Sequence, residues 1–321
     1  MPGRRSFSQL RQRKEQVYFA LVLVALVVLG FVLPRGARSL LVQVMILSIF
    51  AMGYDVSLGF TNQCSLGHSV LFGAGAYAIL LPILHLKAGL LVALLFCLGG
   101  GIAFSLVTGV IAVRLSEAYF VIVTAIFSAI FHLLAVDLTW LTGGDDGLSV
   151  TLPALHLGPV QGSLYNPLVN YFFPLFFLVA SYLVLRRIAH SPLGKIFLAI
   201  RENEKRAEYL GYHVTRYKLI AFVISGVFTA LGGGLYALSL RYTTADFFSL
   251  YWSIIPIVWC LIGGLGTLIG PCLGVLLMSL FQYYVSAWWT YYLIIFGVLI
   301  LFILRVSKGG IVGYVMSRRK A

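Results

Sequence analysis

Residues 88–113 read AGLLVALLFCLGGGIAFSLVTGVIAV and contain no charged side chain. A helix of about 20 apolar residues crosses the hydrocarbon core of a bilayer, and this stretch is long enough to do so. Its apolar residues do not alternate with polar ones, as they would in a strand of a membrane barrel. Residues 18–33 and 247–304 are equally free of charge. The fold class predicted from these stretches is an all-α integral membrane protein.

The composition of the 321 residues agrees, because 60% are hydrophobic and only 10% are charged. Soluble domains carry about 25% charged residues. The formal net charge is +13, but the basic residues gather in the two ends and one central segment, which indicates membrane topology rather than a nucleic-acid surface. The 4 cysteines show no CxxC spacing, so we expect no disulfide, no metal site and no cofactor.

Ten helical spans are predicted from the apolar windows that lie between glycine, proline and charged residues. Together they form a transmembrane domain over residues 17–304, between a basic tail at residues 1–16 and a second basic tail at residues 305–321. The approximate bounds of the spans are 17–34, 39–59, 68–86, 88–113, 116–136, 165–185, 219–240, 251–268, 270–287 and 289–304.

The distribution of Lys and Arg predicts the orientation, since cytoplasmic loops carry most of the positive charge. Both tails are basic and residues 186–218 carry eight Lys or Arg, so all three should be cytoplasmic. Six spans precede the central segment and four follow it, and both even numbers agree with this orientation. Residues 137–164 contain Asp but no basic residue and should be external. Arg35 and Arg38 then lie on the external side, against the rule.

A polar run, GFTNQCSLGH over residues 59–68, separates two apolar windows. Unpaired polar groups in hydrocarbon are costly, so these residues must be hydrated or hydrogen-bonded. One interpretation is that the run lines a pathway through the membrane. The other is a simple turn followed by a packing face of small residues, and His68 alone is more typical of a packing or capping residue. The pathway candidates in this run are Asn62, Gln63, Ser65, Gly67 and His68.

Asp55 lies well inside an apolar window, and an acid within a span is a functional candidate by default, whereas near the interface it would be ordinary. A second interrupted segment, IGGLGTLIGPCLG over residues 262–274, adds Gly264 and Gly266 as pathway candidates. Its Leu, Gly and Gly at 265, 266 and 274 repeat those at 66, 67 and 75 with an offset of 199 residues. Paired interruptions of this kind are typical of inverted repeats, although two unrelated flexible segments would match as well.

The central segment, residues 191–218, shows helical periodicity. Glu202 and Arg206 can pair at i, i+4, and Gly211 is a natural helix stop. We predict one amphipathic helix at the cytoplasmic surface, which either fixes the topology at lipid headgroups or binds a protein partner. Its mixed charge favours a partner, because acidic side chains gain little near acidic headgroups. The predicted inward face comprises Ile196, Ile200, Asn203, Ala207 and Leu210, apolar apart from the Asn.

Four segments, in order, resemble the LivM-type permeases of branched-chain amino acid ABC importers. They are SLGHSVLFGAGAY at 65–77, LTGGDDGL at 141–148, the stretch over 199–236, and GGLGTLIGP at 263–271. The resemblance covers about residues 40–305. Where the family usually has an Asn-bearing LNLLLGYTG run, this chain reads YDVSLGFTN, so Asp55 replaces the amide.

The resemblance implies a permease domain that is not an enzyme and that lies in the inner membrane of a bacterium or archaeon, with both termini cytoplasmic. It implies four kinds of partner: the lipid bilayer, a homologous second permease subunit, two cytoplasmic ATPase subunits and an extracytoplasmic substrate-binding protein. Segment 186–218 then contains the coupling segment that docks on the ATPase. The residues matched to this segment are Ala199, Arg201, Glu202, Asn203, Glu204, Ala207 and Gly211.

Other functions make different demands on the sequence. The chain has no GxxxxGK[ST] phosphate loop, as expected if a partner hydrolyses ATP. An ion-coupled secondary transporter is an alternative and would rely on Asp55. A urea or short-amide ABC permease is a second alternative, because related permeases serve such substrates. An intramembrane enzyme would need a nucleophile with a base or a metal cluster, and neither His68 nor His132 lies in such a constellation.

Overall fold

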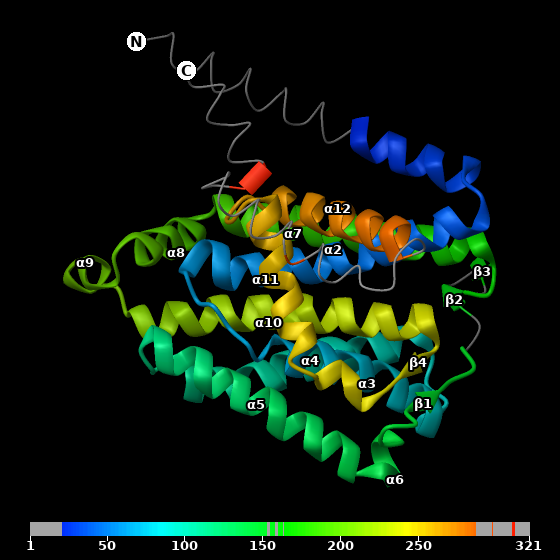
Figure 1. Cartoon of the computed structure of the whole chain (residues 1–321), viewed down its shortest axis with the longest axis horizontal. Helices are drawn as coiled ribbons and strands as arrows, with labels where there is room; N and C mark the ends of the chain where they lie inside the picture. The colour runs from blue at the N-terminus through cyan, green and yellow to red at the C-terminus, as the bar shows by residue number, and fades with distance from the viewer. Residues whose placement is uncertain are drawn as a thin grey trace.

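The computed structural model describes residues 21–152, 155–157, 160–162, 164–286, 297 and 310–311. Within these residues the chain is a bundle of long helices, with short strands at one end and two small helices, α8 and α9, projecting at the other (Figure 1). The long helices are α2 (Arg35–Thr61), α3 (His68–Leu86), α4 (Leu90–Ala112), α5 (Glu117–Asp137), α7 (Pro167–His190) and α10 (Val214–Leu240). The shorter ones are Leu21–Val32, α6 (Thr139–Thr142), α8 (Pro192–Glu202), α9 (Glu204–Tyr209), η1 (Ala245–Phe248), α11 (Tyr251–Gly263) and α12 (Ile269–Ser286).

Among the described residues, 6 helices are long and apolar enough to cross a membrane, namely the six long ones. Helices α2 and α3 are 72% buried over their apolar windows, whereas α5 is 22% buried and α4 is 33% buried. Because the side chains that α4 and α5 expose are aliphatic and aromatic, such as Leu95, Ile122 and Leu133, their outer faces are suited to lipid. The prediction of an α-helical membrane protein is therefore confirmed.

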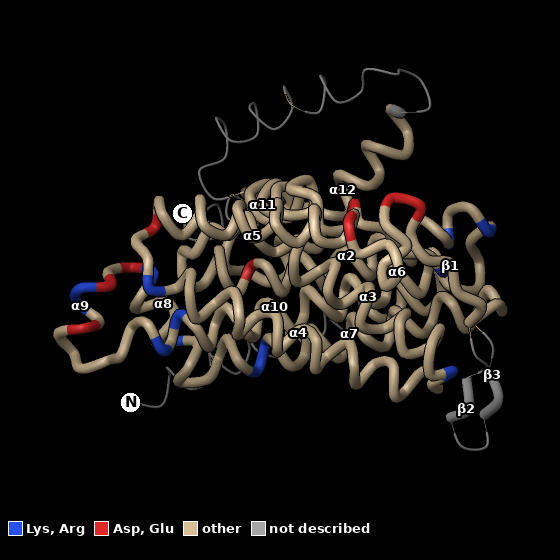
Figure 2. Tube along the Cα trace, turned by 90° about the horizontal axis from the view of Figure 1, so that it is seen from below, with Lys and Arg blue, Asp and Glu red and all other residues tan. Residues whose placement is uncertain are grey.

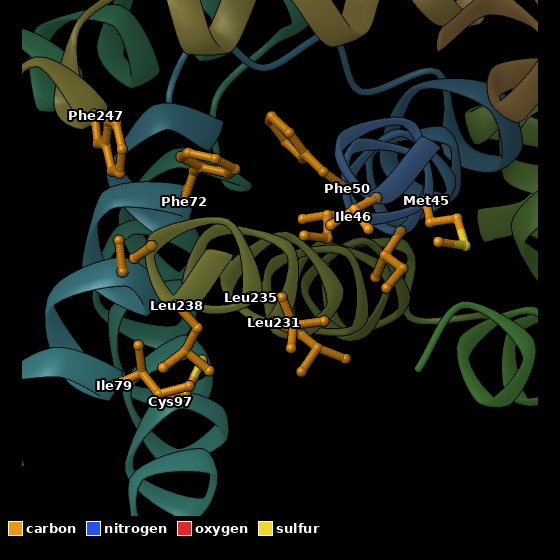
Figure 3. Packing of buried hydrophobic residues seen from close by; sticks show 14 of the residues in the cluster. Met45, Ile46, Phe50, Phe72, Ile79, Cys97, Leu231, Leu235, Leu238 and Phe247 are labelled. Atoms are coloured by element: carbon orange, nitrogen blue, oxygen red, sulfur yellow. The ribbon is translucent and has the colours of Figure 1, made fainter. Parts of the chain in front are cut away.

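Helices α2 and α10 pack against each other in antiparallel directions at the centre. Gly53 lies against Ser225 and Phe228, and Gly232, further along α10, lies against Phe50. Figure 3 shows Ile46 and Phe50 of α2 and Leu231 and Leu235 of α10 within the same buried cluster. The core of the described bundle is therefore built around this pair.

Small residues bring α3 unusually close to α10. A Cβ atom added to Gly75 would lie 2.0 Å from the carbonyl oxygen of Ala230, and one added to Gly233 would lie 2.0 Å from that of Phe72. Side chains larger than hydrogen would push the two backbones apart, which is the role of small residues between membrane helices. This packing face is one of the two roles considered for the residues after His68.

The end of the bundle opposite α8 and α9 carries the strands. Strand β1 (Leu148–Ser149) pairs antiparallel with β4 (Tyr242–Thr243), and β2 (Leu155–Leu157) pairs with β3 (Val160–Gly162). The first pair ties the loop after α5 to the end of α10, and Arg241 stacks its guanidinium on Tyr165 at 4.1 Å from the ring centroid. The predicted external segment 137–164 therefore lies at one end, with the central basic segment at the other (Figure 2).

Two predicted elements differ from the structure. The span predicted at 251–268 is wrong, because α11 has 13 residues and is about 20 Å long, short of the ~30 Å core of a bilayer. Figure 1 shows α11 running across α2 and α10 rather than along them. The single helix predicted in segment 191–218 is divided into α8 and α9 at Asn203. All of the span predicted at 289–304 except residue 297, residues 17–20 of the first span and nearly all of both tails lie outside the described residues.

Candidate functional site

Two neighbouring residues of α2 form hydrogen bonds with the two interrupted segments, which lie between α2 and α3 and between α11 and α12. The Tyr54 hydroxyl donates to the carbonyl oxygen of Ser65 at 2.8 Å, in the segment between α2 and α3. The Asp55 carboxylate accepts from the backbone N–H groups of Gly266 at 2.8 Å and Leu268 at 3.0 Å, in the turn between α11 and α12. Both side chains are fully buried. The two predicted interruptions are thus anchored to adjacent positions of one helix.

The segment over residues 62–67 turns back into the bundle instead of forming a simple turn at its surface. Asn62, in a left-handed conformation with φ of 58°, donates from its amide to Glu117 at the start of α5, at 3.2 Å. Leu66 bonds through its backbone to Thr124 and Ser128 of the same helix, at 3.0 and 2.6 Å. Ser128 follows Glu117 by eleven residues, which corresponds to a rise of about 16 Å along α5. The chain therefore passes from the start of α5 to a point deep inside the bundle before α3 begins.

Polar groups of this segment are satisfied mainly by α2. The N–H of Gln63 donates to the carbonyl of Ser57 at 2.9 Å, and the hydroxyl of Ser57 donates to the carbonyl of Gln63 at 3.0 Å. Thr61 donates to the side-chain oxygen of Gln63 at 3.1 Å. Ser65 uses its hydroxyl to accept from the N–H of Gly67 at 3.1 Å. The sequence therefore provides the hydrogen bonds that an irregular backbone inside a membrane requires.

The first turns of α3 and α11 meet near the centre of the bundle. His68, fully buried, places Nε2 2.7 Å from the hydroxyl of Ser225 and packs its ring against Tyr54. The next residue, Ser69, donates its N–H to the hydroxyl of Ser253 at 2.8 Å. Helix N-termini carry partial positive charge, and two of them converge here.

The turn between α11 and α12 has an unusual backbone. Gly264, Gly266 and Leu268 have φ of 124°, 73° and 59°, and a leucine at positive φ is strained and persists only where its surroundings hold it there. Asp55 does so, because its two carboxylate oxygens accept from the N–H groups that point out of the turn. A Cβ on Gly59, one helical turn after Asp55, would lie 2.0 Å from that carboxylate.

The α8–α9 segment is joined to both central helices. Arg201, near the end of α8, donates to the carbonyl of Gly59 on α2 at 2.5 Å. Glu204, at the start of α9, forms an ion pair with Lys218 on α10. Lys218 is only 8% exposed. Besides their apolar packing, helices α8 and α9 therefore each make one polar contact with the antiparallel pair at the core.

The predicted inward face of this segment is correct in part. Ile200 and Ala207 are each 1% exposed, but Leu210 is 68% exposed and Asn203 faces solvent. Asn203 ends α8 and caps α9, accepting the N–H of Arg206 on its side-chain oxygen at 2.9 Å. The break separates Glu202 from Arg206, so their predicted i, i+4 pairing on one helix is wrong. Ala199 lies on α8, and Gly211, with φ of 87°, follows the end of α9 as predicted.

A cavity of about 400 Å³ opens beside the start of the segment over residues 62–67. Asn62 and Gln63 line it, so these two are the predicted pathway residues that face open space. The structure separates them from Ser65, Gly67 and His68, which are buried. It also separates them from Gly264 and Gly266, which lie in the turn between α11 and α12 that Asp55 holds, here called the tied turn. The residues that line the cavity are Asn62, Gln63, Cys64, Leu115, Glu117, Ala118, Phe120, Val121 and Lys218.

Comparison with known families assigns the architecture. The family described as branched-chain amino acid transport system / permease component matches residues 36–304. The chain belongs to this permease family. Within the described part of this permease, no group of three or more His, Cys, Asp or Glu is arranged to hold a metal ion. Apart from Arg35 at the start of α2, its six long helices and its interrupted segments fall inside the matched range.

Individual relatives of this permease carry the same description. The high-affinity branched-chain amino acid transport system permease protein LivM of Salmonella typhimurium is 27% identical over 285 residues, 83% of this chain and 67% of that protein. The protein of the same name from Escherichia coli gives the same values. A probable branched-chain amino acid transport permease protein LivM of Methanocaldococcus jannaschii is 26% identical over 314 residues, 91% of this chain and 83% of its own length. No solved structure matches the permease significantly.

Several residues that organise the permease site were absent from the sequence-based prediction. Tyr54, Ser225 and Ser253 hold the centre, and Lys218 pairs with α9. A serine in an apolar window gives a weak signal, because most such serines bond to their own helix. The adjacent pair of Tyr54 and Asp55 was the stronger signal, since two polar residues side by side in a span project in different directions and each needs a partner.

Proposed function

We propose that this chain is a permease subunit of an ABC importer that moves branched-chain amino acids across the membrane, energised by partner ATPase subunits. The family match and the names of the relatives support the substrate class. The observation that carries the mechanism is the α8–α9 segment, which projects from the bundle yet is anchored to both α2 and α10 (Figure 1). A projecting element with this anchorage suits the transmission of movement from a partner.

The proposed path of movement runs through Arg201. This residue bonds to the carbonyl of Gly59 and interacts electrostatically with Asp55, which in turn holds Gly266. A shift of α8 against α2 would therefore strain the tied turn, and packed interfaces respond to such strain by switching between discrete arrangements. In this proposal Asp55, Gly264 and Gly266 form a hinge of the pathway rather than a substrate contact.

The other pathway candidates take different roles. Asn62 and Gln63 line the open cavity at the α8–α9 end. Ser65, Gly67 and His68 form the buried closure near the first turn of α3. The two helix N-termini that meet there favour a negatively charged group, such as the carboxylate of an amino acid, when the closure opens. In this proposal, the arrangement with Ser65 and His68 buried is the closed state of the pathway.

We further propose the assembly and orientation that the family implies. The subunit pairs with a homologous second permease, binds two ATPase subunits at α8 and α9, and receives substrate from a binding protein at the end with β1 and β4. In this orientation the protein lies in the inner membrane, with the basic segment 186–218 and both termini on the cytoplasmic side. The arrangement agrees with the positive-inside rule, and Figure 2 shows the charged residues of α8 and α9 at one end of the bundle.

Helix bounds also support an inverted repeat, with a different offset from that of the glycine pattern. Helices α2 and α10 each have 27 residues, start 179 positions apart (214 − 35), and end in left-handed residues with φ of 58°. They run antiparallel, and each is followed by a segment without α-helix that leads to a helix, α3 or α11, starting at the centre. The offset of 199 would instead pair α3 with α12.

The test is reconstitution of the complete transporter. We expect the ATPase subunits to co-purify with this chain and substrate uptake into vesicles to require ATP. Glu202→Arg reverses an exposed charge of α8 and should weaken ATPase docking without changing membrane insertion. Ala207→Pro should act more strongly, because it removes the N–H that donates to the carbonyl of Asn203 at 3.1 Å. Unchanged co-purification of both variants would contradict the docking role.

Two alternative functions are weighed in the same experiment. An ion-coupled transporter would use Asp55 as its ion site and would drive uptake from an ion gradient without ATPase subunits. Asp55 already has both oxygens engaged by backbone N–H groups, which supports the hinge role. A urea or short-amide permease would transport those amides in preference to leucine, and competition for uptake separates the two substrates.

A further inference from the structure

The cavity of about 400 Å³ beside residues 62–64 is lined by Asn62, Gln63 and Lys218 and also by Glu117 and apolar residues that the proposed transport mechanism does not use. It lies between three elements that are remote in sequence: the segment after α2, the first turn of α5 with the turn before it, and the start of α10. Its volume lies in the range of small-molecule sites, about 300–1,000 Å³. The cavity is therefore large enough for a small molecule, and the residues that line it determine which kind of molecule binds.

The walls carry one charge of each sign. Lys218 contributes an ammonium group that is nearly buried, and a buried lysine needs an anion close by, a place that Glu204 of α9 fills in this structure. Glu117 contributes a carboxylate, and its neighbour in the cavity is the amide of Asn62, to which it is hydrogen-bonded at 3.2 Å. Gln63, another amide, is 5% exposed and also lines the space. A ligand that bears both a carboxylate and an ammonium group matches this set.

A second feature favours a carboxylate. Helix α5 begins at Glu117, and its N-cap residue, Ser116, makes no side-chain cap hydrogen bond. The first N–H groups of a helix have no partner within the helix, and they attract anions. Glu117 and Ala118, the first two residues of α5, both line the cavity together with Lys218.

The remaining walls are apolar. Leu115, Phe120 and Val121 line the cavity, and Phe120 is 3% exposed. The transfer of an aliphatic side chain from water to such a surface is favourable. The walls therefore combine a cation, an anion, amides and an aliphatic patch within one space.

We infer that this cavity is a binding site for a free, zwitterionic α-amino acid with an aliphatic side chain. The ligand carboxylate binds Lys218 and the start of α5, its ammonium group binds Glu117 and the amide oxygens, and its side chain packs on Leu115 and Val121. The inference concerns this chain alone. Its regulatory consequence rests on the proposed function and orientation, which put the cavity on the cytoplasmic side, where the imported substrate accumulates.

Occupancy has a direct route to the coupling segment. Lys218 holds Glu204 of α9 in an ion pair, and a ligand carboxylate at Lys218 competes with that partner. Binding therefore breaks the ion pair between α9 and α10 and weakens the anchorage through which an ATPase would act. The site would slow import when cytoplasmic amino acid is abundant.

The direct test measures binding of radiolabelled leucine to the full chain in phosphatidylcholine nanodiscs by scintillation proximity. We expect saturable binding that Lys218→Met and Glu117→Gln each weaken about tenfold or more, because each loses a charge-assisted hydrogen bond. Lys87→Met is the matched control, since Lys87 is exposed at the other end of the bundle, and it should bind as the parent does. Isoleucine and valine should compete well, glycine and 4-methylpentanoic acid poorly.

Ala118→Trp provides a second variant that does not depend on a buried charge. Ala118 is exposed and lines the cavity, so an indole there fills the space without disturbing the core, and binding should be lost. Saturable leucine binding that survives all three cavity variants would overturn the inference, as would its absence from the folded parent chain. So would a lipid as the occupant, seen as binding abolished when phosphatidylethanolamine, whose headgroup is also zwitterionic, replaces phosphatidylcholine.

The regulatory part has its own readout. In vesicles containing the complete transporter, luminal leucine on the ATPase side should slow ATP-driven uptake in the parent and not in Ala118→Trp. Equal inhibition of both would overturn the regulatory role while leaving the binding result in place. Failure of ATP-driven uptake altogether would contradict the proposed function and would not affect the nanodisc measurement.

Discussion

At the scale of single residues, Asp55 illustrates how an acid can be stable inside an apolar helix. Each oxygen accepts a backbone N–H, and those donors belong to residues at positive φ whose N–H groups would otherwise have no partner within helix or sheet. The carboxylate and the turn satisfy each other. The sequence identified the residue as exceptional, but a partner about 210 positions away cannot be recognised from one sequence.

Asp55→Ala should destabilise the fold strongly. It leaves the buried N–H of Leu268 unsatisfied, at a cost of about 1–3 kcal/mol, removes the acceptor of the partly buried N–H of Gly266, and releases the strained turn. We expect a clear decrease in melting temperature of the detergent-solubilised chain, measured by size exclusion after heating. Asp145→Ala, at an exposed loop position, is the control and should change nothing. An unaltered melting temperature for Asp55→Ala would remove the hinge from the proposed mechanism.

Gly59→Ala tests the same contact from the other side. Alanine normally stabilises a helix relative to glycine by about 1 kcal/mol, but here its Cβ would meet the Asp55 carboxylate and the N–H of Gly266 at 2.0 and 2.4 Å. The substitution should therefore lower the melting temperature. Gly36→Ala, on the same helix with nothing within 4 Å, should leave it equal or higher. Equal changes in melting temperature for the two variants would show that the close contact between Gly59 and Asp55 does not affect stability.

At the scale of elements, periodicity and charge predicted most helices to within a few residues but not where they break. The long helices follow from uninterrupted apolar windows. The division of α8 from α9 does not, because Asn203 fits both an amphipathic helix and an N-cap, and only its partner N–H decides. The length of α11 was missed for a related reason: glycines at 263, 264 and 266 sit in an apolar run that hydropathy cannot subdivide.

Asn203→Ala should loosen α9 without affecting the membrane helices. Loss of an N-cap costs about 0.5–2 kcal/mol, and α9 has only 6 residues to resist fraying. We expect weaker co-purification of ATPase subunits with an unchanged melting temperature. Asn203→Asp keeps an oxygen that accepts the N–H of Arg206 and should behave as the parent. If both variants dock the ATPase equally well, the cap is not part of the docking surface.

At the scale of the whole molecule, the antiparallel pair of α2 and α10 unites the separate observations. Helix α2 holds both interrupted segments through Tyr54 and Asp55, and α10 holds His68 through Ser225. Each of the two helices also receives one polar contact from the α8–α9 segment, through Arg201 or Glu204. In the proposed mechanism, a change in the α2–α10 packing acts on the closure around His68 and on the α8–α9 segment together.

Arg201→Gln separates docking from transmission. Arg201 lies in the last turn of α8, where its guanidinium donates to the carbonyl of Gly59 and lies beside Gly266, so Arg201→Gln leaves the charges of Glu202 and of α9 in place. We expect ATPase subunits to co-purify normally and ATP hydrolysis to continue, while uptake of leucine into vesicles falls about tenfold, equivalent to a loss of ~1.4 kcal/mol of coupling. Glu202→Arg, one residue further along the same helix, should give the opposite pattern, with docking lost first. If Arg201→Gln instead lowers docking and uptake in parallel, Arg201 belongs to the docking surface, and the transmission route through Asp55 is wrong.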